Sequence, residues 1–295
     1  MSALEDQSVH VHRAPWSMRK ARRRAIMRRF AYATIAGVLA LIVPIGEDWL
    51  VFQRGGRYHA PEADFEREEV WLRTDDGVRL HAWFCCCPPQ LAAPERERLT
   101  VVYFHGSFGE LTWRQWVARR WHECLGADVL LFDYRGYGLS AGQPSEEGLY
   151  LDARAAHQWV TDVRKLDPNR VVLVGRSLGG AVALELALEV RPRAVVLENT
   201  FTDVRDVAQE HCLGLPVGLV MHNHFPTLER IKQLGQPVFL AHGDNDRVIP
   251  VDHSRRLYCA ANSPKHLLVL PGQGHLDFPP DEYYIALREF LRANP

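Results

Sequence analysis

One segment constrains the fold of this 295-residue chain more than any other feature. An apolar run, Val171–Val174, leads into Gly-Arg-Ser-Leu-Gly-Gly at positions 175–180, and apolar residues then continue to Val190. A continuous Val/Leu run is typical of a strand buried on both faces of a parallel sheet, and a helix that is apolar nearly all round is buried too. Gly175 and Gly179 remove side chains where strand and helix approach each other. The segment therefore predicts a strand, a sharp turn and a helix inside an α/β core.

The rest of the chain repeats this alternation. Apolar runs predict eight strands, at Glu69–Arg73, Arg79–Phe84, Thr100–Phe104, Val129–Asp133, Arg170–Val174, Ala194–Glu198, Pro237–Ala241 and His266–Leu270. Helical spacing predicts five helices, at Glu110–Cys124, Ser145–Arg164, Leu178–Val190, Val251–Ala261 and Asp281–Arg292. Strands that alternate with helices indicate one doubly wound α/β domain, here over residues 67–295, with a mostly parallel eight-stranded sheet. Asp75-Asp76-Gly77 predicts a hairpin between the first two strands.

Charge is distributed unevenly. The formal net charge of the chain is -1, but residues 1–29 carry eight basic side chains and only two acidic ones. A basic amino-terminal segment of this kind indicates either a nucleic-acid arm or a membrane flank. The uncharged run Phe30–Ile45 follows it directly, so a membrane flank is the better interpretation and we expect no nucleic-acid partner.

The apolar run itself has three interpretations. We favour an uncleaved signal anchor over residues 30–46. The uncharged run within it, Phe30–Ile45, has sixteen residues and is short for a bilayer, so the arginines before it must extend to the membrane surface. A cleaved signal peptide and a peripheral amphipathic segment are the alternatives. The positive-inside rule places the amino terminus in the cytoplasm and the main domain on the far side. Residues 47–66 are then interpreted as a linker.

The Gly-x-Ser-x-Gly pattern around Ser177 carries chemistry. Between a strand and a helix, this pattern presents a serine hydroxyl at the carboxyl edge of the sheet, where it can act as a nucleophile. A serine nucleophile needs a histidine base and an acid that holds the histidine. Loops after two later predicted strands supply both, because His275 follows one strand while Asp244 and Asp246 follow the other. The residues alone leave both aspartates open.

An oxyanion formed at this serine needs two backbone donors. The N–H of Leu178, directly after the nucleophile, is one candidate. The other lies in the loop after Thr100–Phe104, where the N–H of Ser107 is the expected donor.

These motifs in this order resemble the α/β-hydrolase superfamily. The similar segments are His105-Gly106, the turn at 133–140, Gly175–Gly180, the Glu-Asn-Thr-Phe-Thr run at 198–202 and the His-Gly-x-x-Asp-x-x-(Ile/Val)-Pro run at 242–250. The chain is most similar to the membrane-anchored serine-hydrolase branch with a single amino-terminal anchor and a short cap. In the family's version of the last run the acid is the fifth residue, so the resemblance assigns the acid to Asp246. Ser107, Glu110 and Phe225-Pro226 depart from the family pattern, which affects the polarity of the pocket and the cap rather than the triad.

The resemblance implies a serine hydrolase that cleaves a carboxylic ester or thioester through Ser177, His275, Asp246 and an acyl-enzyme. The insertion at about 200–236 is rich in apolar residues and is expected to form a cap over the serine, which favours a small acyl or lipid substrate. An amidase or peptidase with the same triad is one alternative. A non-catalytic, membrane-tethered interaction protein is the other.

Other patterns predict no further chemistry. Gly136-x-Gly138-x-x-Ala141 follows a strand as a dinucleotide fingerprint does, but Gln143-Pro144 predicts a loop where that fingerprint requires a helix. The six cysteines show no metal-ligand spacing, and His222-x-His224 has no adjacent cysteine or carboxylate. We therefore expect no cofactor and no metal.

Overall fold

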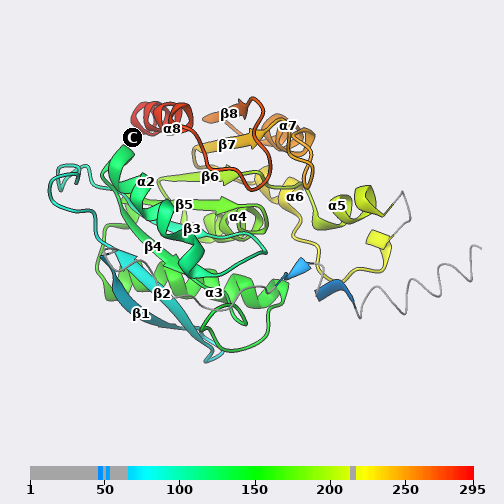
Figure 1. Ribbon diagram of the computed structural model, residues 1–295, viewed down its shortest axis with the longest axis horizontal. Coiled ribbons are helices and arrows are strands. Elements are labelled where there is room, and N and C mark those ends of the chain that lie inside the picture. The colour runs from blue at the N-terminus through cyan, green and yellow to red at the C-terminus, as the bar shows by residue number, and fades with distance from the viewer. Residues whose placement is uncertain (1–45, 49–50, 54–65, 213–216) are drawn as a thin grey trace, which may run out of the picture.

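The computed structural model describes residues 46–48, 51–53, 66–212 and 217–295 (Figure 1). The basic segment 1–29, nearly all of the predicted anchor 30–46 and most of the predicted linker lie outside these described residues. Within the described ranges, no helix is both long enough and apolar enough to cross a bilayer.

An eight-stranded sheet runs through the described residues (Figure 1). Its strands are β1 (Glu68–Arg73), β2 (Arg79–Cys85), β3 (Thr100–Phe104), β4 (Asp128–Phe132), β5 (Val171–Arg176), β6 (Ala194–Glu198), β7 (Val238–Gly243) and β8 (Lys265–Leu270). The order across the sheet is β1-β2-β4-β3-β5-β6-β7-β8. β2 is antiparallel to both of its neighbours, and the strands from β4 to β8 are parallel to one another. The predicted mostly parallel eight-stranded α/β sheet is therefore confirmed.

Helices cover both faces of the sheet. Two of them, α2 (Gln115–Leu125) and α8 (Asp281–Ala293), pack with one hydrophobic cluster. The opposite face carries α3 (Glu146–Gln158), α4 (Leu178–Val190) and α7 (Asp252–Ala260). We call the insertion at 200–236 the cap. It contains α5 (Val204–His211), a 3₁₀ turn η4 (Val217–Leu219) and α6 (Thr227–Ile231). The cap projects from one end of the domain (Figure 1).

Two predicted helices are subdivided. The first begins with a 3₁₀ turn, η1 (Leu111–Arg114), before α2 and ends at Gly126, whose φ is +63°. The helix expected to reach Arg164 instead passes from α3 into a π turn, η2 (Trp159–Val163). There the Arg164 N–H donates to the carbonyl of Trp159, five residues earlier, at 2.8 Å. A short 3₁₀ turn, η3 (Pro168–Arg170), leads into β5.

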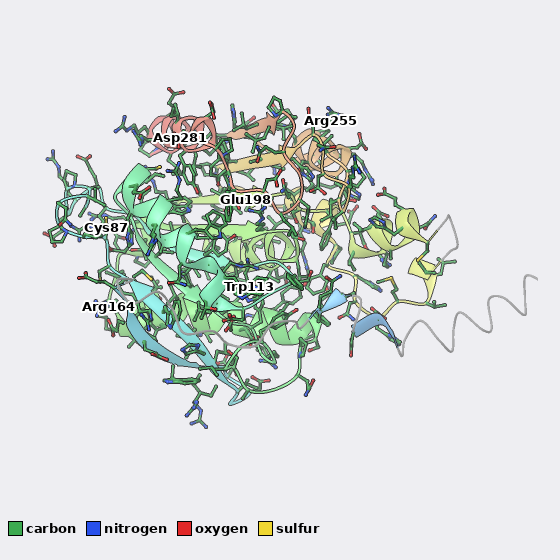
Figure 2. All side chains as sticks on the ribbon, in the orientation of Figure 1. Cys87, Trp113, Arg164, Glu198, Arg255 and Asp281 are labelled. Atoms are coloured by element: carbon green, nitrogen blue, oxygen red, sulfur yellow. The ribbon has the colours of Figure 1, made fainter. Side chains whose placement is uncertain are left out.

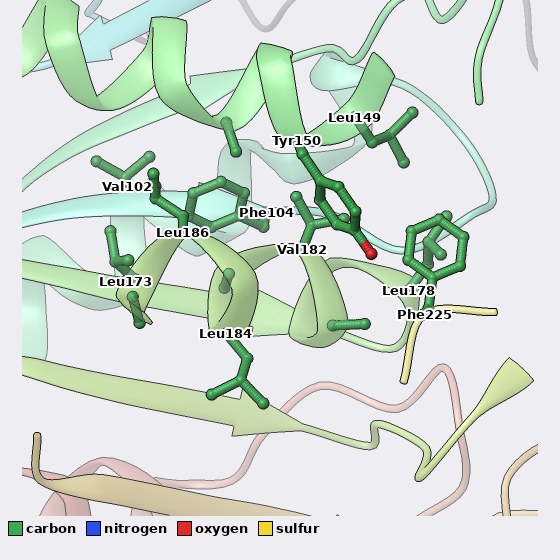
Figure 3. Packing of buried hydrophobic residues seen from close by; sticks show 14 of the residues in the cluster. Val102, Phe104, Leu149, Tyr150, Leu173, Leu178, Val182, Leu184, Leu186 and Phe225 are labelled. Atoms are coloured by element: carbon green, nitrogen blue, oxygen red, sulfur yellow. The ribbon is translucent and has the colours of Figure 1, made fainter. Parts of the chain in front are cut away.

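Helix α4 is the centre of the larger core. Val182 and Leu184 are fully buried, as expected for a helix that is apolar nearly all round. Figure 3 shows Tyr150 of α3 and Phe225 of the cap beside the amino end of this helix. Their rings meet edge to face with centroids 5.8 Å apart. The cap is thereby packed against the same helix that begins directly after Ser177.

Candidate active site

Ser177 occupies a strained turn between β5 and α4. Its backbone has φ +54° and ψ −121°, a conformation that costs energy for a residue with a side chain. The flanking glycines allow this turn, because a Cβ on Gly175 would lie 2.2 Å from the Gly179 carbonyl oxygen. A Cβ on Gly179 would lie 2.0 Å from the carbonyl oxygen of Phe104. Strand and helix can approach this closely only without those side chains.

The structure brings His275 and Asp246 to Ser177. His275 Nε2 lies 3.1 Å from Ser177 Oγ, and His275 Nδ1 lies 2.7 Å from Asp246 Oδ2. Ser177 is 8% exposed and Asp246 is 7% exposed, so both partners of the imidazole are largely shielded from water. This is the spacing in which a base can take a hydroxyl proton while a carboxylate orients it.

Asp246 is held as a carboxylate. Its Oδ1 accepts hydrogen bonds from the backbone N–H groups of Val248 and Ile249, both at 2.8 Å. Burial acts to raise the pKa of Asp246, but hydrogen bonds from His242 and His275 outweigh it and hold the pKa well below 3.8. Asp244 is instead exposed, and its Oδ1 accepts the N–H of Gly272 at 2.7 Å. Of the two aspartates that the sequence leaves open, Asp246 is the one that contacts His275.

The loop after β3 lies directly on Ser177. A Cβ built on Gly106 would lie 3.3 Å from Ser177 Cβ. The Tyr137 hydroxyl donates to the carbonyl of Ser107 at 3.1 Å, which fixes this loop. Ser107 and Leu178, the expected sources of the two oxyanion donors, line the same cavity as Ser177.

A cavity of about 320 Å³ opens over Ser177. Its walls come from the amino-terminal segment, from the loops after β3 and β7, from the start of α4 and, for the largest part, from the cap. The lining residues are Val51, Gln53, Ser107, Ser177, Leu178, Phe201, Val204, Val207, Ala208, His211, Cys212, Met221, Val248 and Ile249. Most of these side chains are aliphatic or aromatic, which suits an apolar ligand with one reactive polar group.

Two residues that sequence reasoning did not single out hold the His275 loop. Arg176 Nη2 donates to the carbonyls of His275 and Asp277 at 2.6 and 2.8 Å. Asn199 Nδ2 donates to the His275 carbonyl at 3.2 Å, and Asn199 Oδ1 accepts the N–H of Gly243 at 3.1 Å. Both lie within the motifs that carry the family resemblance. The sequence signal for them was position: Arg176 is next to Ser177, and Asn199 directly follows β6.

Glu198, the last residue of β6, lies near the middle of the molecule (Figure 2). It is 6% exposed, and its Oε1 accepts the Tyr283 hydroxyl at 2.5 Å. Burial raises the pKa of Glu198. Its backbone carbonyl accepts the Ser177 N–H at 2.8 Å and so contributes to the turn.

The other sequence candidates lie elsewhere. Gly136 is in a loop in which its N–H donates to the Ala141 carbonyl at 2.9 Å, and the next helix, α3, begins only at Glu146. All six cysteines fall in the described part of the chain and are unpaired, and Figure 2 labels Cys87 on the side away from the cap. Among the described residues, no group of three or more histidine, cysteine, aspartate or glutamate side chains could hold a metal.

Residues 100–211 match the family model described as the alpha/beta hydrolase fold. The alpha/beta hydrolase domain-containing protein WAV2 of Arabidopsis thaliana is 33% identical over 228 residues, with 71% of this chain and 72% of WAV2 covered. The chain belongs to the α/β-hydrolase superfamily. This α/β hydrolase is also 40% identical over 209 residues to the uncharacterized protein Rv2307c of Mycobacterium tuberculosis, with 71% and 72% of the two chains covered.

Solved structures share the fold of this α/β hydrolase. The Pyrococcus furiosus esterase Pf2001 superimposes with a TM-score of 0.63 at 21% identity, covering 82% of this chain and 97% of the esterase. A puromycin-hydrolyzing peptidase of Mycobacterium tuberculosis superimposes with a TM-score of 0.62 at 23% identity, covering 80% of this chain and 41% of the peptidase. The superfamily membership supports a hydrolase, and these solved structures share its fold.

Proposed function

We propose that this α/β hydrolase is a serine hydrolase that cleaves a carboxylic ester or thioester with an apolar acyl group. One observation carries the proposal: His275 lies between Ser177 and Asp246, at 3.1 and 2.7 Å, and Ser177 lines an apolar cavity. A nucleophile, a base and an orienting acid are the minimum set for acyl transfer by serine.

In the proposed reaction, Ser177 Oγ attacks the acyl carbonyl carbon while His275 Nε2 takes the hydroxyl proton. Asp246 orients the imidazole and stabilises its positive form. The N–H groups of Ser107 and Leu178 donate to the oxyanion, and each such donor is typically worth about 2.7–4 kcal/mol in the transition state. The alcohol or thiol then leaves with the proton from His275. Water, deprotonated by His275, attacks the acyl-enzyme, and the acid departs as the proton returns to Ser177.

An ester or thioester is favoured over an amide by the cavity. Its cap walls are mostly apolar, and they would bury the chain of an acyl group more favourably than a polar peptide backbone. The fold similarity to a peptidase keeps amide hydrolysis as the second candidate, because the same three side chains serve both reactions.

We also propose that residues 30–46 anchor the enzyme in a membrane, with the amino terminus cytoplasmic and the catalytic domain outside. The support is the charge pattern, a basic segment followed by an uncharged run. Protease added to intact cells should then digest the catalytic domain. Digestion only after lysis would place that domain in the cytoplasm.

Labelling with a fluorophosphonate tests the nucleophile. The wild type should be labelled, and Ser177→Ala should lose both labelling and p-nitrophenyl ester hydrolysis, with kcat falling on the order of 10⁶-fold. Ser263→Ala, at an exposed position, is the matched control and should behave as the wild type does. Equal labelling of Ser177→Ala would contradict the proposal, and hydrolysis of anilides in preference to esters would favour the amidase.

A further inference from the structure

The short segment that follows the predicted anchor packs against the cap. Its described residues are 46–48 and 51–53, drawn in blue beside the yellow cap in Figure 1. Val51 is 5% exposed and Phe52 is 1% exposed, within the larger hydrophobic core. The Phe52 ring meets that of Phe225 with centroids 6.3 Å apart and an interplanar angle of 72°. Although this stretch falls in the predicted linker, its described residues are part of the domain's packing.

Glu47 ties the same segment to the cap through polar contacts. Its carboxylate accepts the backbone N–H of His222 at 2.8 Å and the backbone N–H of Asn223 at 2.5 Å. Asn223 Nδ2 donates to it at 2.9 Å. Glu47 is only 3% exposed, so these bonds compensate a buried charge. Burial acts to raise the pKa of Glu47, but the hydrogen bonds from His222 and Asn223 outweigh it and lower the pKa.

Two residues of the segment reach the cavity over the nucleophile. Val51 and Gln53 line it together with Ser177 and Leu178, while Met221 of the cap and Val248 of the loop after β7 contribute other parts of the wall. The cavity wall therefore combines residues near position 50 with residues near positions 220 and 250, which are far apart in the sequence. Its volume of about 320 Å³ lies at the lower end of the roughly 300–1,000 Å³ of small-molecule sites. Such a volume suits one acyl chain of moderate length rather than a lipid with two chains.

We propose that Val51 and Gln53 belong to the acyl-binding site, and that Glu47 clamps them against the cap so that they set acyl-chain selectivity. This inference rests on the proposed esterase or thioesterase function. Val51 lies only a few residues after the uncharged run Phe30–Ile45, so the chain that leads to the predicted anchor also forms part of the substrate wall. The substrate class is then a single-chain acyl ester or thioester.

The test compares hydrolysis of p-nitrophenyl octanoate and p-nitrophenyl acetate by the full chain in detergent micelles. Val51→Trp fills the cavity from the amino-terminal segment, and Val248→Trp fills it from the β7 loop. Each should lower the ratio of kcat/KM for octanoate to that for acetate by about tenfold or more. Val163→Trp, at a position 67% exposed on η2, is the matched control and should keep the wild-type ratio.

The outcomes separate this inference from the proposed function. A changed ratio for Val248→Trp with a wild-type ratio for Val51→Trp overturns the inference and leaves the proposed function standing. Wild-type enzyme that hydrolyses neither ester overturns the proposed function and the inference with it. If Val51→Trp does not fold, as judged by circular dichroism, Val51→Ala decides, because a wider cavity should shift preference from octanoate toward decanoate. An unchanged preference would overturn the inference.

The clamp has its own matched pair. Glu47→Ala removes the acceptor for the His222 and Asn223 N–H groups and should raise KM for octanoate more than KM for acetate. Asp48→Ala alters an exposed neighbouring carboxylate and should leave both values unchanged. Equal effects of the two substitutions would overturn the assignment of Glu47.

Discussion

At the scale of single residues, the site depends on which aspartate carboxylate contacts the Nδ1 atom of His275. Asp244 and Asp246 lie two positions apart on one loop, yet only Asp246 contacts His275. Its other oxygen accepts two backbone N–H groups, so the loop itself fixes the direction of the carboxylate. Asp244 is used to hold the neighbouring loop at Gly272. Two chemically identical side chains therefore have different roles because of local backbone geometry.

The exchange Asp246→Asn should lower kcat for ester hydrolysis by about 10⁴-fold, because the amide no longer orients or stabilises the protonated His275. Asp244→Asn is the matched control and should retain most of the activity. Steady-state kinetics with p-nitrophenyl esters measures both variants. A larger loss of kcat in Asp244→Asn than in Asp246→Asn would show that Asp244 is the acid that orients His275.

Asp246 should also make stability depend on pH. Its pKa in the folded protein lies below 3.8, so the ionised carboxylate stabilises the fold above that value. This contribution should be lost as the pH falls through the folded pKa. Urea unfolding should therefore show a stability difference between wild type and Asp246→Asn that shrinks as the pH falls below about 4. A difference that grows on acidification would contradict the direction of the shift.

At the scale of elements, the junction of β5 and α4 determines the position of Ser177. The φ of +54° at Ser177 is maintained because β5 is buried between two parallel neighbours and α4 is buried in the core. The strained turn is thus supported by packing on both sides of it. Helix α4 also contacts the cap through Phe225, so this helix connects Ser177 to the cap that forms much of the cavity wall.

The variant Gly179→Ala should be destabilised by about 1–3 kcal/mol, because its Cβ would meet the Phe104 backbone and neither element can shift freely. Gly235→Ala is the control, since nothing lies within 4 Å of a Cβ built there. Chemical denaturation of both variants provides the measurement. Equal stabilities would show that strand and helix have room to separate.

At the scale of the whole molecule, two carboxylates hold the cap to the domain. Glu47 accepts N–H groups at 222 and 223 of the cap, and Glu146 of α3 accepts those of His224 and Phe225 at 2.6 and 3.0 Å. Four consecutive cap residues are thus anchored from two distant parts of the chain. Since this stretch follows Met221 of the cavity wall, its position affects the shape of the cavity.

We expect Glu146→Gln to lose about 1–3 kcal/mol of stability, because an amide cannot accept both cap N–H groups and its NH₂ faces a donor. Tm should fall by about 2–4 °C for each kcal/mol. Glu147→Gln, its exposed neighbour, should unfold as the wild type does. Thermal unfolding followed by circular dichroism checks this pair. Equal Tm values for both variants would show that the Glu146 carboxylate does not stabilise the cap.

Much of the fold was predictable because its signals are local. Every predicted strand is present within two residues at each end, since a run of apolar residues between turn residues reports burial on both faces of a sheet. The turn at Ser177 was predictable for the same reason, because glycines, strand and helix are adjacent in sequence. The loops that supply His275 and the two candidate aspartates were predictable because the carboxyl ends of parallel strands meet at one edge of the sheet. The family resemblance, rather than this topology, selected Asp246.

The π turn after α3 and the cap's contacts were not predictable in this way. The sequence by itself determined the sheet, the turn at Ser177 and the loops that carry His275 and the two candidate aspartates, because neighbouring residues encode those features. Only the tertiary structure decided that Asp246 rather than Asp244 reaches the imidazole by direct contact. It also decided that Val51 joins the cavity wall beside Ser177 and that Glu47 accepts the His222 N–H, although the residues of each pair lie more than 120 positions apart. Contacts between segments so far apart leave no periodic pattern in either segment, so they become visible only when the chain is folded.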